Sequence, residues 1–206
     1  MEKTRIAVLV SGGGTNLQAL IDAQQTGLLA SGRIVLVISN RPGAYALERA
    51  KAAGIEALTI TVKGCGGQEA FETALTDALD ARGIDLIVLA GFMNILSAGF
   101  TGHFENRIIN VHPALIPSFC GKGFYGLRVH EAALSYGVTV TGATVHYVNE
   151  VPDGGRIILQ KAVSVLPGDT PETLQRRVME QAEWIILPEA AELVSSRILK
   201  EKESRK

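Results

Sequence analysis

Short runs of apolar residues alternate with amphipathic stretches through the first half of the chain. The runs cover residues 5–10, 34–39, 57–61 and 86–89. Runs that do not alternate with polar residues are typical of strands buried on both faces, as in a parallel sheet. After the first run Leu17, Leu20 and Ile21 recur at helical spacing, and further helices are predicted over residues 46–53 and 69–82. This order of elements predicts a doubly wound α/β fold.

The second half keeps the sheet and adds an antiparallel element. Strands are predicted over residues 107–111, 138–148 and 156–163, with a short helix at 129–135. Because no helix separates the last two strands, they are predicted to pair in antiparallel fashion. The fold class we expect is therefore α/β, with a doubly wound, mostly parallel sheet and an antiparallel strand pair in the C-terminal half.

The last part of the chain is predicted to be helical. Asp169 or Thr170 is expected to cap a helix, because both residue types suit that position and an apolar helical pattern follows. Pro188 is expected to interrupt the helical pattern before a last helix over residues 190–199. Residues 200–206 are charged and are expected to form a solvated, fraying end.

Length and composition fit one globular domain over residues 1–206, with 47% hydrophobic and 20% charged residues. The net charge of −1 gives no electrostatic reason to expect nucleic acid or an anionic membrane as a partner. The apolar run at 6–10 is too short for a signal-peptide core or a membrane span, so we expect a cytoplasmic protein. Cys65 and Cys120 lie far apart, and free thiols are expected.

Asn110 and His112 stand two residues apart at the end of an apolar run, just before Pro113. On a strand their side chains point to the same face, because successive residues alternate. An amide can donate a hydrogen bond to a developing oxyanion, and an imidazole can do the same or carry a proton near neutral pH. The pair therefore suits chemistry at a carbonyl. The alternative is that both side chains cap the backbone of a turn.

The stretch from Ser11 to Asn16 holds three glycines between a strand and a helix. Such a loop lets the backbone approach an anion, and the helix start offers free amide groups, so a monophosphate would bind well. The spacing fails the dinucleotide pattern, because Leu17 stands where a third glycine is required. Arg41, after the second strand, would suit a 2′-phosphate. A monophosphate site, a dinucleotide site and a tight turn without ligand all remain open.

Three further groups of residues complete the candidates. The loop over residues 90–96 either lines a flat apolar pocket or covers the sheet edge as core. Thr144 and His146 share a strand face, and Asp153 either supports an imidazole or forms a turn before two glycines. His103 and His130 are interpreted as surface or helix-end residues, and the histidine spacing does not favour a metal site.

Taken together, the motifs resemble the folate-dependent phosphoribosylglycinamide formyltransferase family. The resemblance runs from Val8 to about Ala191. Its most specific parts are Ser11-Gly-Gly-Gly-Thr-Asn-Leu17, Leu89-Ala-Gly-Phe-Met93, Ile109-Asn-Val-His-Pro-Ala-Leu-Ile-Pro117, and Gly142-Ala-Thr-Val-His-Tyr-Val148 with Asp153-Gly154-Gly155. Several motifs in the right order are far more specific than any one of them.

The resemblance implies a Rossmann-like enzyme that transfers the formyl group of 10-formyltetrahydrofolate, its cosubstrate, to the amine of glycinamide ribonucleotide in purine biosynthesis. It implies a phosphate-binding half over residues 1–105, a catalytic and folate-binding half over residues 106–206, small-molecule substrates, no metal, and a monomer or homodimer.

The residues that match the family's sites are carried over by position. They are the catalytic Asn110, His112 and Asp153; the phosphate-binding Gly14, Thr15 and Asn16; the folate-binding Gln68, Met93, Asn94, Ile95, Leu96, Asn110, Asn149 and Asp153; Glu183 for a ribose contact; and the supporting Thr144 and His146.

The chain departs from the family pattern in three places. Gln68 and Asn94 stand where arginine is common, which bears on folate affinity. The loop over residues 118–127 is longer, and residues 179–183 align only with a one-residue shift. Competing functions are hydrolysis of the formyl donor, formylation of an initiator tRNA, and a nucleotide-sensing or folate-binding module without catalysis.

Overall fold

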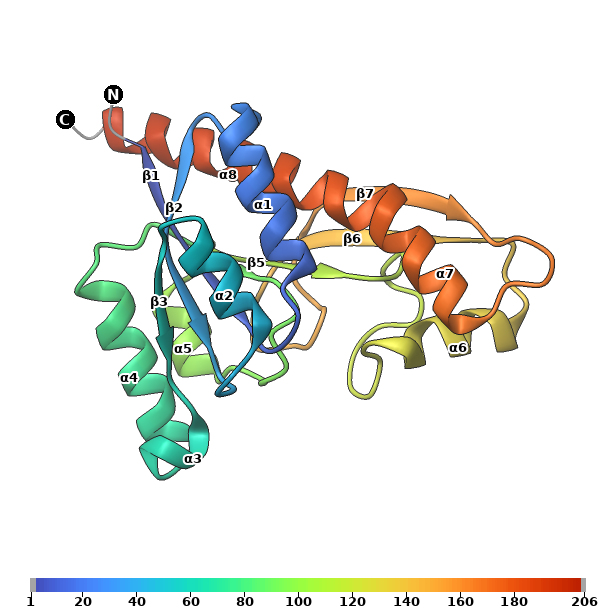
Figure 1. Cartoon of the computed structure of the whole chain (residues 1–206), viewed down its shortest axis with the longest axis horizontal. Helices are drawn as coiled ribbons and strands as arrows, with labels where there is room; N and C mark the ends of the chain where they lie inside the picture. The colour runs from blue at the N-terminus through green and yellow to red at the C-terminus, as the bar shows by residue number, and fades with distance from the viewer. Residues whose placement is uncertain (1–2, 205–206) are drawn as a thin grey trace.

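A computed structural model describes residues 3–204, which form one seven-stranded sheet with helices on both faces (Figure 1). The strand order is β3-β2-β1-β4-β5-β6-β7. The strands are β1 (Thr4–Val10), β2 (Gly32–Ser39), β3 (Glu56–Thr59), β4 (Leu86–Leu89), β5 (Ile108–His112), β6 (Val140–Tyr147) and β7 (Ile157–Ser164). The order confirms the predicted fold class.

The helices fill the crossovers and the C-terminal end. They are α1 (Thr15–Thr26), α2 (Tyr45–Ala52), α3 (Val62–Cys65), α4 (Gln68–Asp80), α5 (Ala98–His103), α6 (Leu127–Tyr136), α7 (Pro171–Val178), a π-helical turn η1 (Met179–Glu183) and α8 (Trp184–Glu203). No helix within residues 3–204 is long and apolar enough to cross a membrane.

Strand direction changes once across the sheet. The five strands from β3 to β5 are parallel, while β6 runs antiparallel to β5 and to β7. The predicted antiparallel pair β6–β7 is confirmed. The first crossovers leave β1 toward β2 and β3, and β4 then lies on the other side of β1. Such a switch of direction places the loops after β1 and β4 beside each other at the carboxyl edge, where open α/β sheets bind ligands.

Both faces of the central strands are covered, which explains their unbroken apolar sequence. In β1, Ile6, Val8 and Val10 pack into the core beneath α1 and α8, whereas Ala7 and Leu9 pack into the core beneath α4 and α5. All five side chains are fully buried. A strand buried on both faces cannot alternate with polar residues, because each polar group would lose its hydration.

Helix α8 runs unbroken through Pro188, so the predicted interruption there is wrong. Proline lacks an N–H, and its ring collides with the carbonyl four residues before it, here that of Trp184. The π-helical turn η1 ends directly before Trp184, whose ψ of −9° opens the backbone at that carbonyl. Pro188 is itself buried in the core. Packing and the wide turn together therefore accommodate the proline.

Two short helices escaped prediction, and the C-terminal helix is longer than predicted. Helices α3 and α5 are too short for a periodic pattern, although Thr61 and Ser97 cap them by accepting from backbone N–H groups. Residues 200–203 are helical rather than frayed, and Lys202 pairs with Asp85 at 2.7 Å. Residues 205–206 lie outside the described part of the chain.

Thr170 caps α7, and Asp169 has a different role. The Asp169 carboxylate accepts two hydrogen bonds from Arg177, at 2.5 and 2.6 Å, and one from the Leu166 N–H at 2.8 Å. Only 4% of the Asp169 side chain is exposed. The hydrogen bond from Arg177, which outweighs the opposing effect of burial, holds the pKa of Asp169 well below its usual range.

Replacing Asp169 with Asn should lower the melting temperature at neutral pH by about 3–6 °C, because charge-assisted hydrogen bonds of this kind contribute about 1–2 kcal/mol. A depressed folded-state pKa gives stability that is present above the unfolded pKa of about 3.9 and lost as pH falls below it. The difference between wild type and D169N, measured by thermal denaturation, should therefore shrink below about pH 4.

Glu180→Gln is the matched control for this prediction. Glu180 pairs with Arg176 at 2.9 Å on the same helical segment, but the Arg176 side chain is 81% exposed. Exposed pairs contribute little, so E180Q should change the melting temperature by less than about 2 °C. Equal losses of melting temperature in D169N and E180Q would contradict a special role for the buried pair of Asp169 and Arg177.

Candidate active site

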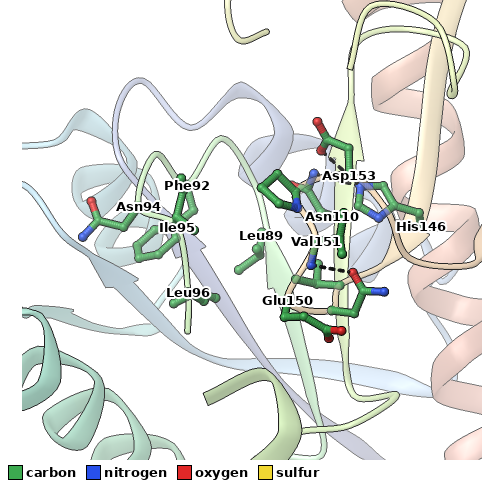
Figure 2. A pocket seen from close by; sticks show the side chains of 13 residues that line it. Leu89, Phe92, Asn94, Ile95, Leu96, Asn110, His146, Glu150, Val151 and Asp153 are labelled. Atoms are coloured by element: carbon green, nitrogen blue, oxygen red, sulfur yellow. Dashed lines mark hydrogen bonds and ion pairs between the residues drawn. The ribbon is translucent and has the colours of Figure 1, made fainter. Parts of the chain in front are cut away.

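Four loops meet at the carboxyl edge of the sheet. They follow β1, β4 and β5 and join β6 to β7. The hydroxyl of Ser11, in the loop after β1, accepts from the Met93 N–H at 2.8 Å, which ties the glycine loop to the loop after β4. Between the β4 and β6–β7 loops lies an open pocket (Figure 2).

Asp153 reaches His112, as the sequence hypothesis requires. One carboxylate oxygen, Oδ2, lies 3.5 Å from His112 Nδ1, and the other, Oδ1, lies 3.5 Å from His146 Nε2. The Gly121 N–H donates to Oδ2 at 2.8 Å. The carboxylate therefore lies between two imidazoles that come from adjacent antiparallel strands.

Asp153 is held in a backbone conformation that few non-glycine residues adopt, with φ of 57°. Strained residues of this kind persist where surrounding structure fixes them, and they cluster at functional sites. Two residues later, Gly155 lies so close to β6 that a Cβ there would be 1.7 Å from the Tyr147 carbonyl oxygen. Gly155 is thus required by the close approach that brings Asp153 back over the sheet.

The hydrogen bonds of His112 fix which ring nitrogen carries its permanent proton. His112 Nε2 lies 2.8 Å from the Phe119 carbonyl oxygen. A carbonyl can only accept, so Nε2 carries a hydrogen and Nδ1, beside Asp153, is the atom that gains or loses a proton. Burial lowers the pKa of His112, and the charge of Asp153 and the bond to Phe119 oppose this shift without reversing it.

His146 and Asn110 are coupled in the same way. His146 Nδ1 lies 2.8 Å from the Tyr147 carbonyl oxygen, so Nδ1 carries a hydrogen. In the neutral ring Nε2 then accepts from Asn110 Nδ2, at 3.2 Å, whereas in the charged ring the same nitrogen donates to Asp153 Oδ1, 3.5 Å away. This leaves one N–H and the oxygen of Asn110 for the pocket, which Asn110 lines. His146 therefore orients Asn110.

Asp153 remains a carboxylate in this setting. Burial acts to raise its pKa, but the interaction with His146, the charge of His112 and the Gly121 N–H together hold the pKa below the ordinary value. Thr144 lies opposite His112 on β6. Its hydroxyl donates to the Ala114 carbonyl at 2.7 Å and so fixes the loop after β5.

The glycine loop leads directly into α1. Gly14 adopts a left-handed conformation, with φ of 73°, and a Cβ there would lie 2.6 Å from the Cβ of Ala46. As N-cap, Gly14 supplies no side chain to the first amide groups of α1, which leaves them available for an anion. Thr15 and Asn16 begin that helix.

Glu183 lies beside this loop, because Asn16 Nδ2 donates to the Glu183 carboxylate at 2.7 Å. Burial raises the pKa of Glu183, although Asn16 opposes the shift. Glu183 ends the π-helical turn η1.

The structure brings most of the carried-over folate residues to the pocket. Asn94, Ile95, Leu96, Asn110, Asn149 and Asp153 all line it. Met93 and Gln68 do not belong to the lining. Gln68 instead donates to the Ile95 carbonyl at 3.1 Å and to Glu72 at 2.7 Å, and so supports the loop from behind.

The other lining residues also lie in stretches that the sequence pointed to. Leu89 and Val148 end quoted motifs, Phe92 belongs to the loop over residues 90–96, and Glu150, Val151 and Pro152 lie in the segment from Asn149 to Asp153 that the family resemblance assigns to the folate. The contacts that Phe119 and Gly121 make through their backbone could not be predicted from the sequence, because other residues offer the same N–H and carbonyl groups.

His130 is fully buried on α6, so its interpretation as a surface or helix-end residue is wrong. Burial, with a smaller contribution from the charge of His112, lowers the pKa of His130 to about 4. His103 does end α5 and is half exposed beside Asp80. Cys65 and Cys120 are free thiols, as predicted. Within residues 3–204 no group of three or more metal-ligating side chains is arranged to hold a metal ion.

Comparison with known proteins gives consistent matches. Residues 4–191 match the formyl transferase family. The chain is 42% identical to the phosphoribosylglycinamide formyltransferase of Haemophilus influenzae, covering 89% of this chain and 84% of that protein. It is 47% identical to the trifunctional purine biosynthetic protein adenosine-3 of Bos taurus, covering 95% of this chain but only 19% of that longer protein.

The solved structures agree. The glycinamide ribonucleotide transformylase 1 of Symbiobacterium toebii superposes with a TM-score of 0.88 at 45% identity, covering 94% of this chain and 88% of that one. Fold and site thus define a class, a doubly wound α/β protein with an Asn-His-Asp centre suited to carbonyl chemistry. The chain belongs to the formyl transferase family, and within it to the phosphoribosylglycinamide formyltransferases.

Proposed function

We propose that this protein transfers the formyl group of 10-formyltetrahydrofolate to the amine of glycinamide ribonucleotide, a step of purine biosynthesis. The observation that carries the proposal is the meeting of Asn110, His112 and Asp153 beside a largely apolar pocket. The glycine loop lies at the same edge of the sheet and suits the phosphate of the ribonucleotide. Family membership supports the same reaction.

In the proposed mechanism the amine attacks the formyl carbon directly. The carbonyl oxygen becomes negative, and the free N–H of Asn110 donates to it; a preorganised donor of this kind contributes about 10²–10³ in rate. His112 assists through Nδ1, the nitrogen beside Asp153. Burial favours its neutral form in the free protein, and a developing oxyanion would favour the charged form. The tetrahedral intermediate then collapses and releases the folate nitrogen.

Asp153 has two roles in this proposal. Its negative charge stabilises a proton on His112 Nδ1, and it accepts the proton that the attacking amine must lose. That proton is then delivered, directly or through water, to the leaving folate nitrogen. No covalent intermediate with the protein is required.

The remaining site assignments are part of the same proposal. We assign the ribonucleotide phosphate to Gly14, Thr15 and Asn16, and a ribose hydroxyl to Glu183. We assign the folate to the pocket, with Thr144 and His146 as supporting residues. Residues 1–105 would serve mainly the phosphate and residues 106–206 the formyl donor. A cytoplasmic location and a monomer or homodimer complete the proposal, consistent with the free cysteines.

The test is a formylation assay with the purified protein, both substrates and no added metal. Formylated ribonucleotide should accumulate in proportion to enzyme, and no formate should be released when the ribonucleotide is omitted. Formate release without an acceptor would instead favour hydrolysis. A well-folded preparation that binds either substrate but forms no product would support a binding module and refute the proposal.

A further inference from the structure

Two carbonyl groups of the glycine loop between β1 and α1 are held by α2. The Gly12 carbonyl accepts from the Ala46 N–H at 3.1 Å, and the Gly13 carbonyl accepts from Arg49 Nε at 2.8 Å. Ala46 and Arg49 both belong to α2, which packs against α1 (Figure 1). These two carbonyls are therefore turned toward α2.

The direction of each carbonyl also fixes the direction of the N–H group that follows it. A peptide group is planar, and in the trans form its C=O and N–H point in opposite directions. The peptides of the glycine loop are trans. The N–H groups of Gly13 and Gly14 therefore point away from α2, and neither donates to a backbone carbonyl within residues 3–204. Successive N–H groups presented in this way can bind an anion.

The peptide between Gly13 and Gly14 is the one that most needs to be held in place. Glycine adopts positive and negative φ about equally readily, so a peptide group between two glycines can turn over at little cost. Gly14 already has a φ of 73°. A turned peptide would direct the Gly13 carbonyl oxygen, in place of the Gly14 N–H, at a bound anion. The carbonyl oxygen would repel that anion.

Among the described residues, Arg49 is the only one whose side chain holds a carbonyl of the three glycines. The carbonyls of Gly12 and Gly14 accept from backbone N–H groups, which most substitutions leave in place. Arg49 is itself oriented, because its Nη1 donates to the Gln18 side chain at 2.9 Å and its guanidinium carbon lies 5.0 Å from the centre of the Tyr45 ring. The direction of the Gly14 N–H thus depends on one side chain.

We propose that Arg49 is a positioning residue that holds the Gly13–Gly14 peptide with its N–H group toward the phosphate of the ribonucleotide. Arg49 acts through this peptide and touches neither substrate. The inference rests on the proposed function, in which the glycine loop binds the phosphate, and adds the residue that sets the polarity of that loop. Because the phosphate is remote from the reacting amine, Arg49 affects binding of the ribonucleotide and leaves the chemical step unchanged.

Arg49→Met and Arg49→Gln together test this inference. Gln places an amide NH₂ where Arg has Nε, whereas Met places a methyl group there. Both variants lose the positive charge and the bond to Gln18, so they differ chiefly in the donor to the Gly13 carbonyl. In R49M the KM for the ribonucleotide should rise about tenfold, equivalent to about 1.4 kcal/mol. In R49Q it should rise no more than about threefold, since the donor is retained.

The remaining kinetic constants and a control variant separate positioning from other effects. In R49M and R49Q, kcat and the KM for the formyl donor should stay within about twofold of wild type. Lys51→Met is the control for loss of charge, because Lys51 is an exposed cation on the same helix. Its KM for the ribonucleotide should stay within about twofold of wild type, because exposed charges are strongly screened.

Calorimetric titration with ribose 5-phosphate gives a readout that does not depend on catalysis. Its affinity should fall in R49M by about the same factor as the KM for the ribonucleotide rises. A KM in R49M equal to that of wild type overturns the inference, and so does an equal rise in R49M and R49Q, which would assign the effect to charge. A wild type that binds ribose 5-phosphate but forms no product refutes the proposed function instead.

Discussion

Asp153→Asn should reduce kcat by about 10³-fold, within the range expected for loss of a positioned acid-base group. The amide keeps the size of the carboxylate and can still accept from the Gly121 N–H, which lies 2.8 Å away. It removes the negative charge beside His112 Nδ1 and cannot accept the amine proton. The KM for the ribonucleotide should stay nearly constant, because the phosphate loop is not touched.

The pH profile of D153N tests the electrostatic part of this prediction. Asp153 opposes the burial that lowers the pKa of His112, so removing its charge should lower that pKa further. If the reaction uses charged His112, the fall in kcat on the alkaline side should begin at a lower pH in D153N than in wild type. Kinetics identical to wild type would mean that Asp153 serves only as a turn residue.

Glu150→Gln provides the control for a general loss of pocket charge. Glu150 lines the same pocket and is the other carboxylate there, but no ion pair ties it to an imidazole within residues 3–204. The kcat of E150Q should stay within about threefold of wild type, since only interactions made in the transition state change kcat. A loss of kcat in E150Q as large as that in D153N would mean that the overall negative charge of the pocket matters, and not the contact between Asp153 and His112.

Gly155→Ala should reduce the activity by about 10³-fold. The substitution displaces the Asp153 carboxylate, whereas D153N only removes its charge. The added Cβ would lie 1.7 Å from the Tyr147 carbonyl oxygen and 2.6 Å from its carbon. The backbone at residue 155 and the backbone at Tyr147 must therefore move apart. The same carbonyl accepts from His146 Nδ1, so the orientation of Asn110 is lost together with the position of Asp153.

Gly155→Ala should also lower the melting temperature by several degrees, since overpacking costs about 1–3 kcal/mol. Gly102→Ala is the control, because nothing lies within 4 Å of a Cβ there and the position is inside helix α5. G102A should keep full activity and match or exceed wild-type stability. Activity in G155A near that of wild type would contradict the close approach seen between the β6–β7 loop and strand β6.

Asn110, His112 and Asp153 show how much of the site could be predicted from the sequence. Asn110 and His112 could be assigned to one strand face from their spacing alone, because side chains on a strand alternate. Asp153 could be named from its motif, but its distance from His112 could not be derived. That distance depends on the pairing of β5 with β6 and on the bend at Gly155, which are contacts between residues far apart in the chain.

The errors have a similar origin. Pro188 has a helix-breaking sequence signal, and burial beside a π-helical turn overrides it. His130 has a polar side chain within an amphipathic helix, and the sequence does not show that this face is covered. In both cases packing in the tertiary structure stabilises an arrangement that the local sequence preference does not predict.

The sequence by itself determined the class of fold, the order of nearly all strands and long helices, and the candidate residues for the chemistry. It did so because apolar periodicity reports burial locally and the motifs lie in contiguous stretches. Only the tertiary structure decided which groups meet: Asp153 with two imidazoles, Glu183 with Asn16, and Arg49 with the Gly13 carbonyl. Such meetings depend on sheet order and loop closure, which bring together residues separated by 7 to 167 positions, as His112 with Phe119 and Asn16 with Glu183.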